Sequence, residues 1–515
     1  MTGRTLWVDI DDLLYHLSHH NRPSGIQRVV YELSRALVTM APDHVRFVRR
    51  GHGPCDFVTV DWTYIHALFD SVTGAAPTQA PPPAAPPPPR PGVPFAPPAD
   101  NAALLPAILD TQLEVVKQLA VAPLNAVQHA LRMIDVKRRA NIEREALLAE
   151  VGEDAVVVEE GVRLADAARP GDAFFVPGSP WRHADYGRSV RWLRDELRMS
   201  FGLLMYDLVP IRCPEWCDRG IISTFSQWHR MILPLADRIF AISDATRRDV
   251  EAHAVEQRLL LNDAVQSIGM GSGFGQTPQQ DAGRPKLSGK RWPSAQRSPH
   301  LPPEGSYVLF VSTIEARKNH ALLFRVWRRL LEERPAEDVP TLVFAGRVGW
   351  LVADLMQQLE NANWLDGKIR LISGPSDAEL AELYQGCLFT AFPSIFEGWG
   401  LPVTESLSFG KPCVASSTTS IPEAGGPLGR YFDPEDIDDA LRVIGEVLDD
   451  PAGLEQWRRQ VVREFVPTPW ETQARSVLKA YGVEFGATPH STAKSQDMSS
   501  GKNSLRKTPM QKASP

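Results

Sequence analysis

The chain has 515 residues, of which 43% are hydrophobic, and its formal net charge is -7 at pH 7. This length allows two or three domains, and the hydrophobic fraction is ordinary for a globular protein that folds in water. The acidic balance argues against a protein that binds nucleic acid through bulk positive charge.

Three features favour a cytoplasmic location. There is no apolar run of about 18 residues, so no transmembrane helix is expected. Residues 1–9 lack the apolar core of a secretory signal and already predict a strand. The five cysteines are scattered and odd in number, which suits a reducing compartment. Cys213 and Cys217 are interpreted as ordinary thiols, because no further histidine or cysteine pair stands nearby to complete a zinc site.

The N-terminal part begins with the pattern of an α/β protein. Residues 6–10 predict a buried strand, and apolar residues at helical spacing predict a helix over residues 26–37. The intervening loop, residues 11–25, lies where a doubly wound sheet binds its ligands. Asp11 and Gly25 are therefore candidates for ligand contact.

Two unusual segments follow. Residues 77–98 consist mostly of proline and alanine, which predicts a polyproline or disordered loop rather than a docking site for a proline-binding partner. Residues 107–149 predict a helical insertion that carries the basic run Lys137–Arg139. We favour a solvated insertion over a membrane-surface contact, because nearby glutamates dilute the positive charge.

The alternation of strands and helices then resumes. Further strands are expected at residues 173–176, 201–206, 238–242 and 265–268. Ser243 is a plausible N-cap for the next helix, where either Arg247 or Arg248 could face a phosphate while the other is solvated. Residues 271–305 are rich in glycine, proline, serine and glutamine, which indicates an interdomain linker.

The second half of the chain is more regular. Its expected strands are residues 308–311, 342–345, 369–372, 388–392 and 413–415, and its expected helices include residues 322–331, 351–359 and 377–384. Repeated strand–helix units imply a parallel sheet with helices on both faces. The polar residues 487–515 predict a disordered tail.

The most informative segment is residues 392–405. It reads as strand, glycine-rich loop and helix, with Glu397 and Glu405 eight positions apart and Gly398 and Gly400 between them. Backbone N–H groups of such a turn form a nest that favours phosphate, and the two carboxylates could accept hydrogen bonds from sugar and ribose hydroxyls. A nucleotide-sugar would use all three features.

This segment resembles the E-x7-E signature of retaining glycosyltransferases of the GT-B fold, family 4 in the usual classification, and residues 311–319, 344–350 and 412–417 also fit that family in order. The resemblance implies two Rossmann-like domains whose parallel sheets face a cleft. Its implied boundaries are an N-terminal acceptor-side domain at 1–270, a linker at 271–305, a nucleotide-sugar-binding domain at 306–466 and a helix at 467–486 that crosses back to the first domain.

The resemblance also assigns roles on the donor side. Lys318 would stabilise the leaving diphosphate, with help from Arg317. Glu405 would bind the ribose, and Glu397 would hold a hydroxyl of the donor sugar and help to stabilise positive charge at the anomeric carbon. The backbone contacts would come from Gly398, Gly400 and Leu401.

The chain departs from the family pattern at two positions. Several relatives have an arginine where this chain has Thr313, and many have a histidine where it has Tyr206. Asp207, which follows that tyrosine, is a candidate for positioning substrate, and the alternative is a loop cap. Asp9 and Asp11 are interpreted as loop and acceptor-side residues, with Gly25 in the same acceptor-side loop. No metal or resident cofactor is expected.

The implied function is transfer of a hexose from a nucleotide-sugar to a glycan or lipid-linked acceptor in polysaccharide biosynthesis, with GDP-mannose as the preferred donor and a possible peripheral contact with the membrane. The implied mechanism is a front-face reaction in which the leaving diphosphate takes the acceptor proton. Two alternatives stay open: a catalytically degenerate scaffold in polysaccharide assembly, which Tyr206 leaves possible, and a sugar-nucleotide epimerase of the same fold.

Overall fold

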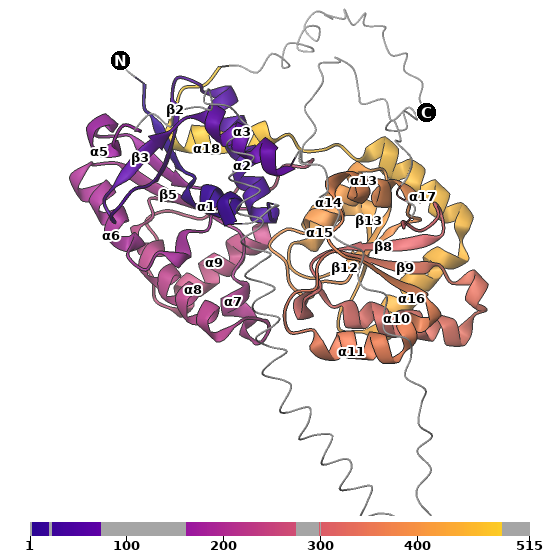
Figure 1. Ribbon diagram of the computed structural model, residues 1–515. Helices are drawn as coiled ribbons and strands as arrows, with labels where there is room; N and C mark the ends of the chain where they lie inside the picture. The colour runs from indigo at the N-terminus through magenta and orange to yellow at the C-terminus, as the bar shows by residue number, and fades with distance from the viewer. Residues whose placement is uncertain (1–2, 20–22, 74–160, 274–297, 299, 487–515) are drawn as a thin grey trace, which may run out of the picture. The chain divides into compact units, whose positions relative to one another are not determined.

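The computed structural model describes residues 3–19, 23–73, 161–273, 298 and 300–486 (Figure 1). The predictions for the proline-rich segment 77–98, the helical insertion 107–149, most of the linker 271–305 and the tail 487–515 therefore lie outside the described residues. The described part contains two β-sheets.

The first sheet has seven strands in the order β3-β2-β1-β4-β5-β6-β7. All neighbouring pairs are parallel except β2 with β3. The strands are β1 (Leu6–Asp9), β2 (Val45–Arg50), β3 (Phe57–Val60), β4 (Ala173–Val176), β5 (Ser200–Met205), β6 (Arg238–Ala241) and β7 (Gln266–Ser267). The sequence prediction omits β2 and β3, which lie at one edge of this sheet.

The second sheet has six strands in the order β10-β9-β8-β11-β12-β13, and all neighbouring pairs are parallel. The strands are β8 (Tyr307–Val311), β9 (Thr341–Ala345), β10 (Ile369–Ile372), β11 (Thr390–Phe392), β12 (Cys413–Ser416) and β13 (Gly429–Phe432). The expectation of two Rossmann-like α/β sheets is confirmed. The cleft between them stays a prediction.

Helices pack against these sheets. With the first sheet the main helices are α1 (Asp11–His19), α2 (Gly25–Met40), α3 (Trp62–Thr73), α6 (Tyr186–Arg191), α8 (Arg219–Ile232) and α9 (Asp244–Glu256). With the second they are α10 (His320–Glu333), α11 (Ala353–Asn361), α13 (Asp377–Gly386), α14 (Leu401–Ser408), α15 (Ile421–Gly425), α16 (Ile437–Asp449) and α17 (Pro451–Glu464).

Strand β8 shows how the second sheet is covered. Its side chains alternate between the two faces, as a pleated strand requires. Val308 and Phe310 pack in one apolar cluster with residues of α10, such as Trp327. Tyr307 packs in another cluster with Tyr384 of α13. Figure 1 shows the sheet between these two helices, so both faces are buried and the strand reads as a continuous apolar run.

The segment between β1 and α2 differs from its prediction. Residues 11–19 form helix α1 rather than a loop, with Asp11 and Asp12 in its first turn. Acidic side chains are favourable there because the N-terminus of a helix carries partial positive charge. The predicted loop is therefore divided, and Asp11 begins a helix.

The last helix returns to the first sheet. Residues of α18 (Trp470–Tyr481), among them Val477 and Tyr481, pack in the same apolar cluster as Leu33 of α2. The chain thus crosses back after completing the second sheet. Among the described residues, no helix combines the length and apolar composition needed to cross a bilayer.

Candidate active site

The candidate site forms where two neighbouring strands of the second sheet end. Strand β8 leads into the 3-10 turn Ala316–Lys318, and strand β11 leads into the loop at residues 393–400. Because β8 and β11 are adjacent and parallel, their carboxyl ends meet at one edge of the sheet. This is the edge at which open α/β sheets bind ligands.

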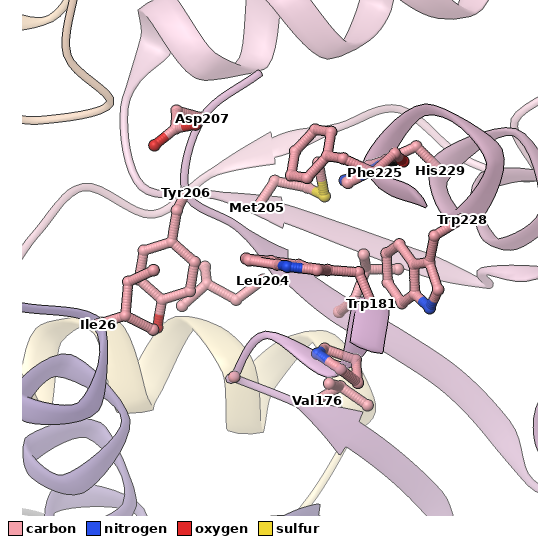
Figure 2. Close-up of a pocket in the computed structure, with 13 residues that line it drawn as sticks. Ile26, Val176, Trp181, Leu204, Met205, Tyr206, Asp207, Phe225, Trp228 and His229 are labelled. Atoms are coloured by element: carbon pink, nitrogen blue, oxygen red, sulfur yellow. Dashed lines mark hydrogen bonds between the residues drawn. The ribbon is translucent and has the colours of Figure 1, made fainter. Parts of the chain in front are cut away.

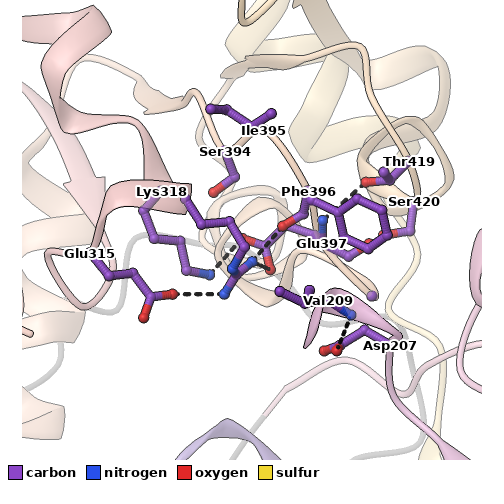
Figure 3. Close-up of polar contacts among 12 residues, drawn as sticks. Asp207, Val209, Glu315, Lys318, Ser394, Ile395, Phe396, Glu397, Thr419 and Ser420 are labelled. Carbon is purple, nitrogen blue, oxygen red and sulfur yellow. Dashed lines mark hydrogen bonds and ion pairs between the residues drawn. The ribbon is translucent and has the colours of Figure 1, made fainter. Parts of the chain in front are cut away.

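An ion-pair cluster joins these two loops (Figure 3). Lys318 Nζ lies 2.5 Å from Glu397 Oε1, and a guanidinium nitrogen of Arg317 lies 3.1 Å from Glu397 Oε2. Arg317 also contacts Glu315 at 2.7 Å. One carboxylate therefore serves two cations, and all four side chains are largely buried. Lys318 and Arg317 are therefore engaged in buried ion pairs rather than solvated at the surface.

The pairing sets the charge state of the cluster. Burial alone would raise the pKa of Glu397, but the attraction of Arg317 and Lys318 outweighs it and lowers that pKa to about 2. Burial would lower the pKa of Arg317, yet Glu397 and Glu315 together raise it. Burial lowers the pKa of Lys318, and Glu397 opposes that shift. Glu397 is thus an anion at any physiological pH.

Hydroxyl groups hold the backbone of Glu397. Its N–H donates to Thr419 Oγ1 at 3.1 Å, and its carbonyl accepts from Ser420 Oγ at 2.8 Å. Thr419, Ser420 and Glu315 were not predicted as site residues from the sequence. The signal for Thr419 and Ser420 is the run of serines and threonines at 416–420, which begins at the last residue of β12, the strand beside β11 in the sheet.

The glycine turn places the start of helix α14. Gly398 is buried, and Gly400 has φ +105, a conformation that favours glycine. Gly400 is the N-cap, and Leu401 is the first residue of α14. The backbone N–H groups at this helix start are the expected anion contacts, and that role stays a prediction.

Glu405 lies in the second turn of α14. Its Oε2 accepts a hydrogen bond of 2.7 Å from the hydroxyl of Tyr384, a residue that was likewise not predicted from the sequence. Burial raises the pKa of Glu405, and the bond from Tyr384 opposes that shift.

Asp207 follows β5 of the first sheet. Its Oδ1 accepts from the N–H of Val209 at 3.1 Å, so the interpretation as a loop cap is confirmed as geometry. Burial raises its pKa, while the charge of Arg317 is the largest influence that lowers it. Asp207 is therefore electrostatically coupled to the ion-pair cluster, and a role in positioning substrate stays a prediction.

Tyr206 is buried at 8% exposure, and its hydroxyl donates to the carbonyl of Pro177 at 2.6 Å. Its side chain points away from that of Asp207, beside a small cavity lined with aromatic residues such as Trp181 and Phe225 (Figure 2). The phenol thus has a packing role and makes a fixed hydrogen bond.

The acceptor-side candidates separate into two groups. Asp11 begins α1 and pairs with His183 at 3.1 Å, and Gly25 is the exposed first residue of α2. Asp9, in contrast, is not a loop residue, and that interpretation is wrong. It is the last residue of β1 at 4% exposure, and it stays buried because Tyr186 donates a hydrogen bond to its carboxylate. Burial raises the pKa of Asp9 to about 6.

The two arginines at the start of α9 are engaged by carboxylates. Ser243 caps this helix as expected, accepting from the N–H of Thr246 at 3.0 Å. Arg247 pairs with Glu251 at 2.7 Å and with a second carboxylate of its own helix, whereas Arg248 is 59% exposed. These pairs favour surface roles over phosphate contact.

Known proteins place these loops in a family. Residues 294–463, which include both strand ends of the site, match the family model described as glycosyl transferases group 1. This part of the chain is a group 1 glycosyltransferase domain. The resemblance of residues 392–405 to glycosyltransferases is thereby confirmed at the level of group 1, whereas family 4 and the retaining mechanism stay predictions.

Curated relatives of this glycosyltransferase domain include mannosyltransferases. The O-antigen chain mannosyltransferase B of Escherichia coli is 32% identical over 175 residues, which is 34% of this chain and 45% of that protein. The MMP alpha-(1->4)-mannosyltransferase of Mycolicibacterium hassiacum is 36% identical over 116 residues, which is 21% of this chain and 28% of that protein. The chain thus spans less than half the length of these relatives.

Solved structures give a weaker likeness. A glycosyltransferase from Rickettsia africae has 16% identity and a TM-score of 0.41 over 60% of this chain and 76% of that chain. HepE of Anabaena, solved in complex with UDP, has 15% identity and a TM-score of 0.42 over 60% of this chain and 78% of that chain. Both scores lie below 0.5, so neither likeness bears on the site.

Proposed function

We propose that this protein is a retaining hexosyltransferase that moves a hexose, with mannose preferred, from a nucleotide-sugar to a glycan or lipid-linked acceptor in polysaccharide biosynthesis. The observation that carries the proposal is the buried cluster of Glu397, Lys318 and Arg317 where β8 and β11 end. The mannosyltransferases among the relatives support the choice of mannose as the sugar. GDP-mannose as its donor is part of the proposal.

On the donor side, Lys318 and Arg317 are the cations that would meet the diphosphate. A donor brings a second anion to the cations that Glu397 now neutralises, so the carboxylate must share or leave them. Once turned towards the sugar, Glu397 would accept a hydroxyl hydrogen bond and stabilise positive charge at the anomeric carbon.

The reaction itself would need no covalent nucleophile. The bond from the anomeric carbon to the diphosphate oxygen breaks, and the acceptor hydroxyl attacks from the same face. The leaving diphosphate takes the acceptor proton. The contribution of the protein is then to position the substrates and to stabilise charge. A largely buried ion-pair cluster is suited to this task.

The acceptor would lie on the side of the first sheet, near Asp11 and Gly25. Asp11 is held by His183, so its carboxylate has a fixed direction. Carboxylates of this kind accept hydrogen bonds from sugar hydroxyls. A peripheral contact with a membrane would follow from a lipid-linked acceptor.

A donor panel tests the proposal. The purified protein is incubated with GDP-mannose, UDP-glucose and other nucleotide-sugars together with candidate acceptor glycans, and released nucleoside diphosphate is measured. We expect release with one donor and an acceptor, and a product whose anomeric configuration by NMR equals that of the donor. An inverted product would contradict the retaining mechanism. Absence of release and of nucleotide binding would favour the scaffold.

Glu405 provides a specific test of donor binding. In Glu405→Ala the nucleotide ribose loses its charged acceptor, so the affinity for free GDP should fall by about 1.5–3 kcal/mol, the range for hydrogen bonds to charged groups. Titration calorimetry measures this affinity. Unchanged affinity in a folded variant would remove Glu405 from the site.

A further inference from the structure

Glu405 receives its hydrogen bond from a buried residue of another helix. Tyr384 lies on α13 at 1% exposure, and its hydroxyl donates to Glu405 Oε2 at 2.7 Å. Helix α13 precedes β11 in the chain and α14 follows it. The bond therefore joins the two helices on either side of the strand that leads to the site.

The position of this hydroxyl is fixed from several sides. The ring of Tyr384 stacks on Phe409, with centroids 5.0 Å apart and planes 8° from parallel. Phe409 is the C-cap of α14, so the ring lies against the same helix that carries Glu405. Helix α13 begins with a capping box in which Ser376 and Glu379 satisfy each other's backbone N–H groups. Because the phenol of Tyr384 is held in this way, its hydrogen bond restricts the orientation of the Glu405 carboxylate.

The hydrogen bond from Tyr384 also affects the charge state of Glu405. Burial raises the pKa of Glu405, and the hydrogen bond from Tyr384 is the largest influence that lowers it. Arg28 also lowers that pKa and Asp377 raises it. These two residues pair with each other at 2.7 Å, so their fields at Glu405 largely cancel. Tyr384 is thus the main group that favours the ionised carboxylate.

We propose that Tyr384 is the positioning residue of the donor site: its hydroxyl occupies Oε2 of Glu405 and leaves Oε1 to receive the hydroxyl pair of the nucleotide ribose. Among the described residues, no hydrogen bond reaches Oε1. The inference rests on the proposed function, because it takes Glu405 to be the ribose contact. Tyr384 acts through Glu405 and does not itself touch the nucleotide.

The test removes the hydroxyl and keeps the ring. Tyr384→Phe retains the stack on Phe409, and we expect its affinity for GDP or UDP, measured by titration calorimetry, to be about tenfold weaker than the parent's. Donor KM should rise while kcat at saturating donor stays unchanged. With 2′,3′-dideoxy GDP, which lacks the ribose hydroxyls, parent and variant should bind equally weakly.

The pH dependence of binding gives a second readout. Loss of a hydrogen bond that favours the charged form raises the pKa of Glu405 further. As the pH is lowered, the affinity of Tyr384→Phe for GDP should therefore begin to fall at a higher pH than the parent's affinity does. A purely structural role of Tyr384 would not produce this difference.

Two controls separate the possible failures. Ser376→Ala removes the cap of the same helix without touching Glu405, and should lower the melting temperature while the affinity for GDP stays at the parent's value. If Ser376→Ala weakens GDP binding as much as Tyr384→Phe does, the stability of α13 explains both losses and the inference is overturned.

The second control, Glu405→Gln, should bind GDP weakly. If Glu405→Gln binds GDP weakly and Tyr384→Phe binds it like the parent, Tyr384 does not position Glu405, while the proposed function stands. If the parent protein binds neither GDP nor UDP, the inference and the proposed function are both contradicted.

Discussion

Replacing Glu397 by glutamine is expected to reduce kcat by about 10²–10³-fold, the usual cost of removing one group that stabilises transition-state charge. Glutamine keeps the shape of the side chain but cannot offset positive charge at the anomeric carbon. The affinity for free GDP should not fall and is expected to increase, because Lys318 and Arg317 would no longer be neutralised by the carboxylate that now contacts both. Steady-state kinetics and calorimetry measure the two effects.

Glu315→Gln is the matched control. It makes the same change in the same cluster, but Glu315 contacts Arg317 and has no ion pair with Lys318. Its effect on kcat should be smaller. If Glu397→Gln loses affinity for GDP, Glu397 contacts the nucleotide rather than the sugar. If the kcat of Glu397→Gln equals that of the parent, Glu397 has no role in the reaction.

Lys318→Ala should lower kcat by an amount that corresponds to ~2.7–4 kcal/mol of transition-state energy, by analogy with the loss of one oxyanion donor. It should also cost stability, by about 1–3 kcal/mol, because a buried carboxylate loses one of its partners. Lys368→Ala is the control, since that lysine donates to the carbonyl of Val339 and to no carboxylate of the cluster. Equal kcat in Lys318→Ala and the parent would contradict the role in phosphate departure.

The same variant should unfold at a higher pH when acidified. The pKa of Glu397 is depressed to about 2, so the stability from its pairing is present above its ordinary pKa and is lost as the pH falls towards 2. Without Lys318 the pKa is less depressed, so the pairing contributes less stability and that contribution is fully lost at a higher pH. Acid titration followed by circular dichroism shows the midpoint, and an unshifted midpoint would mean that Arg317 alone holds the carboxylate.

Much of the fold can be predicted because a parallel sheet buries both faces of its strands. Strand β8 is a continuous apolar run, and the predicted residues 308–311 differ from it only by Tyr307. Strand β2 mixes arginines with apolar residues and lies beside the edge strand β3, so its pattern resembles a half-exposed surface segment. Strand β13 is short, lies at the other edge and contains the exposed Arg430.

The site is only partly readable from the sequence. Spacing identifies Glu397 and Glu405 because both belong to one strand–loop–helix segment. Their partners come from elsewhere: Lys318 follows another strand, and Tyr384 lies on another helix. The order of the strands in a sheet is set by the tertiary fold. Local sequence patterns therefore cannot predict these contacts. Asp9 was misplaced for the same reason, since its buried position depends on Tyr186 far along the chain.

The ion-pair cluster has one more consequence, for the rate at which a donor arrives. The ion pairs of Glu315, Glu397, Arg317 and Lys318 combine as many negative as positive charges. Such a group has almost no field beyond contact distance, and the chain as a whole is acidic. Capture of a diphosphate would therefore gain no electrostatic steering from this cluster, and added salt, which screens the repulsion by the acidic chain, should not slow it.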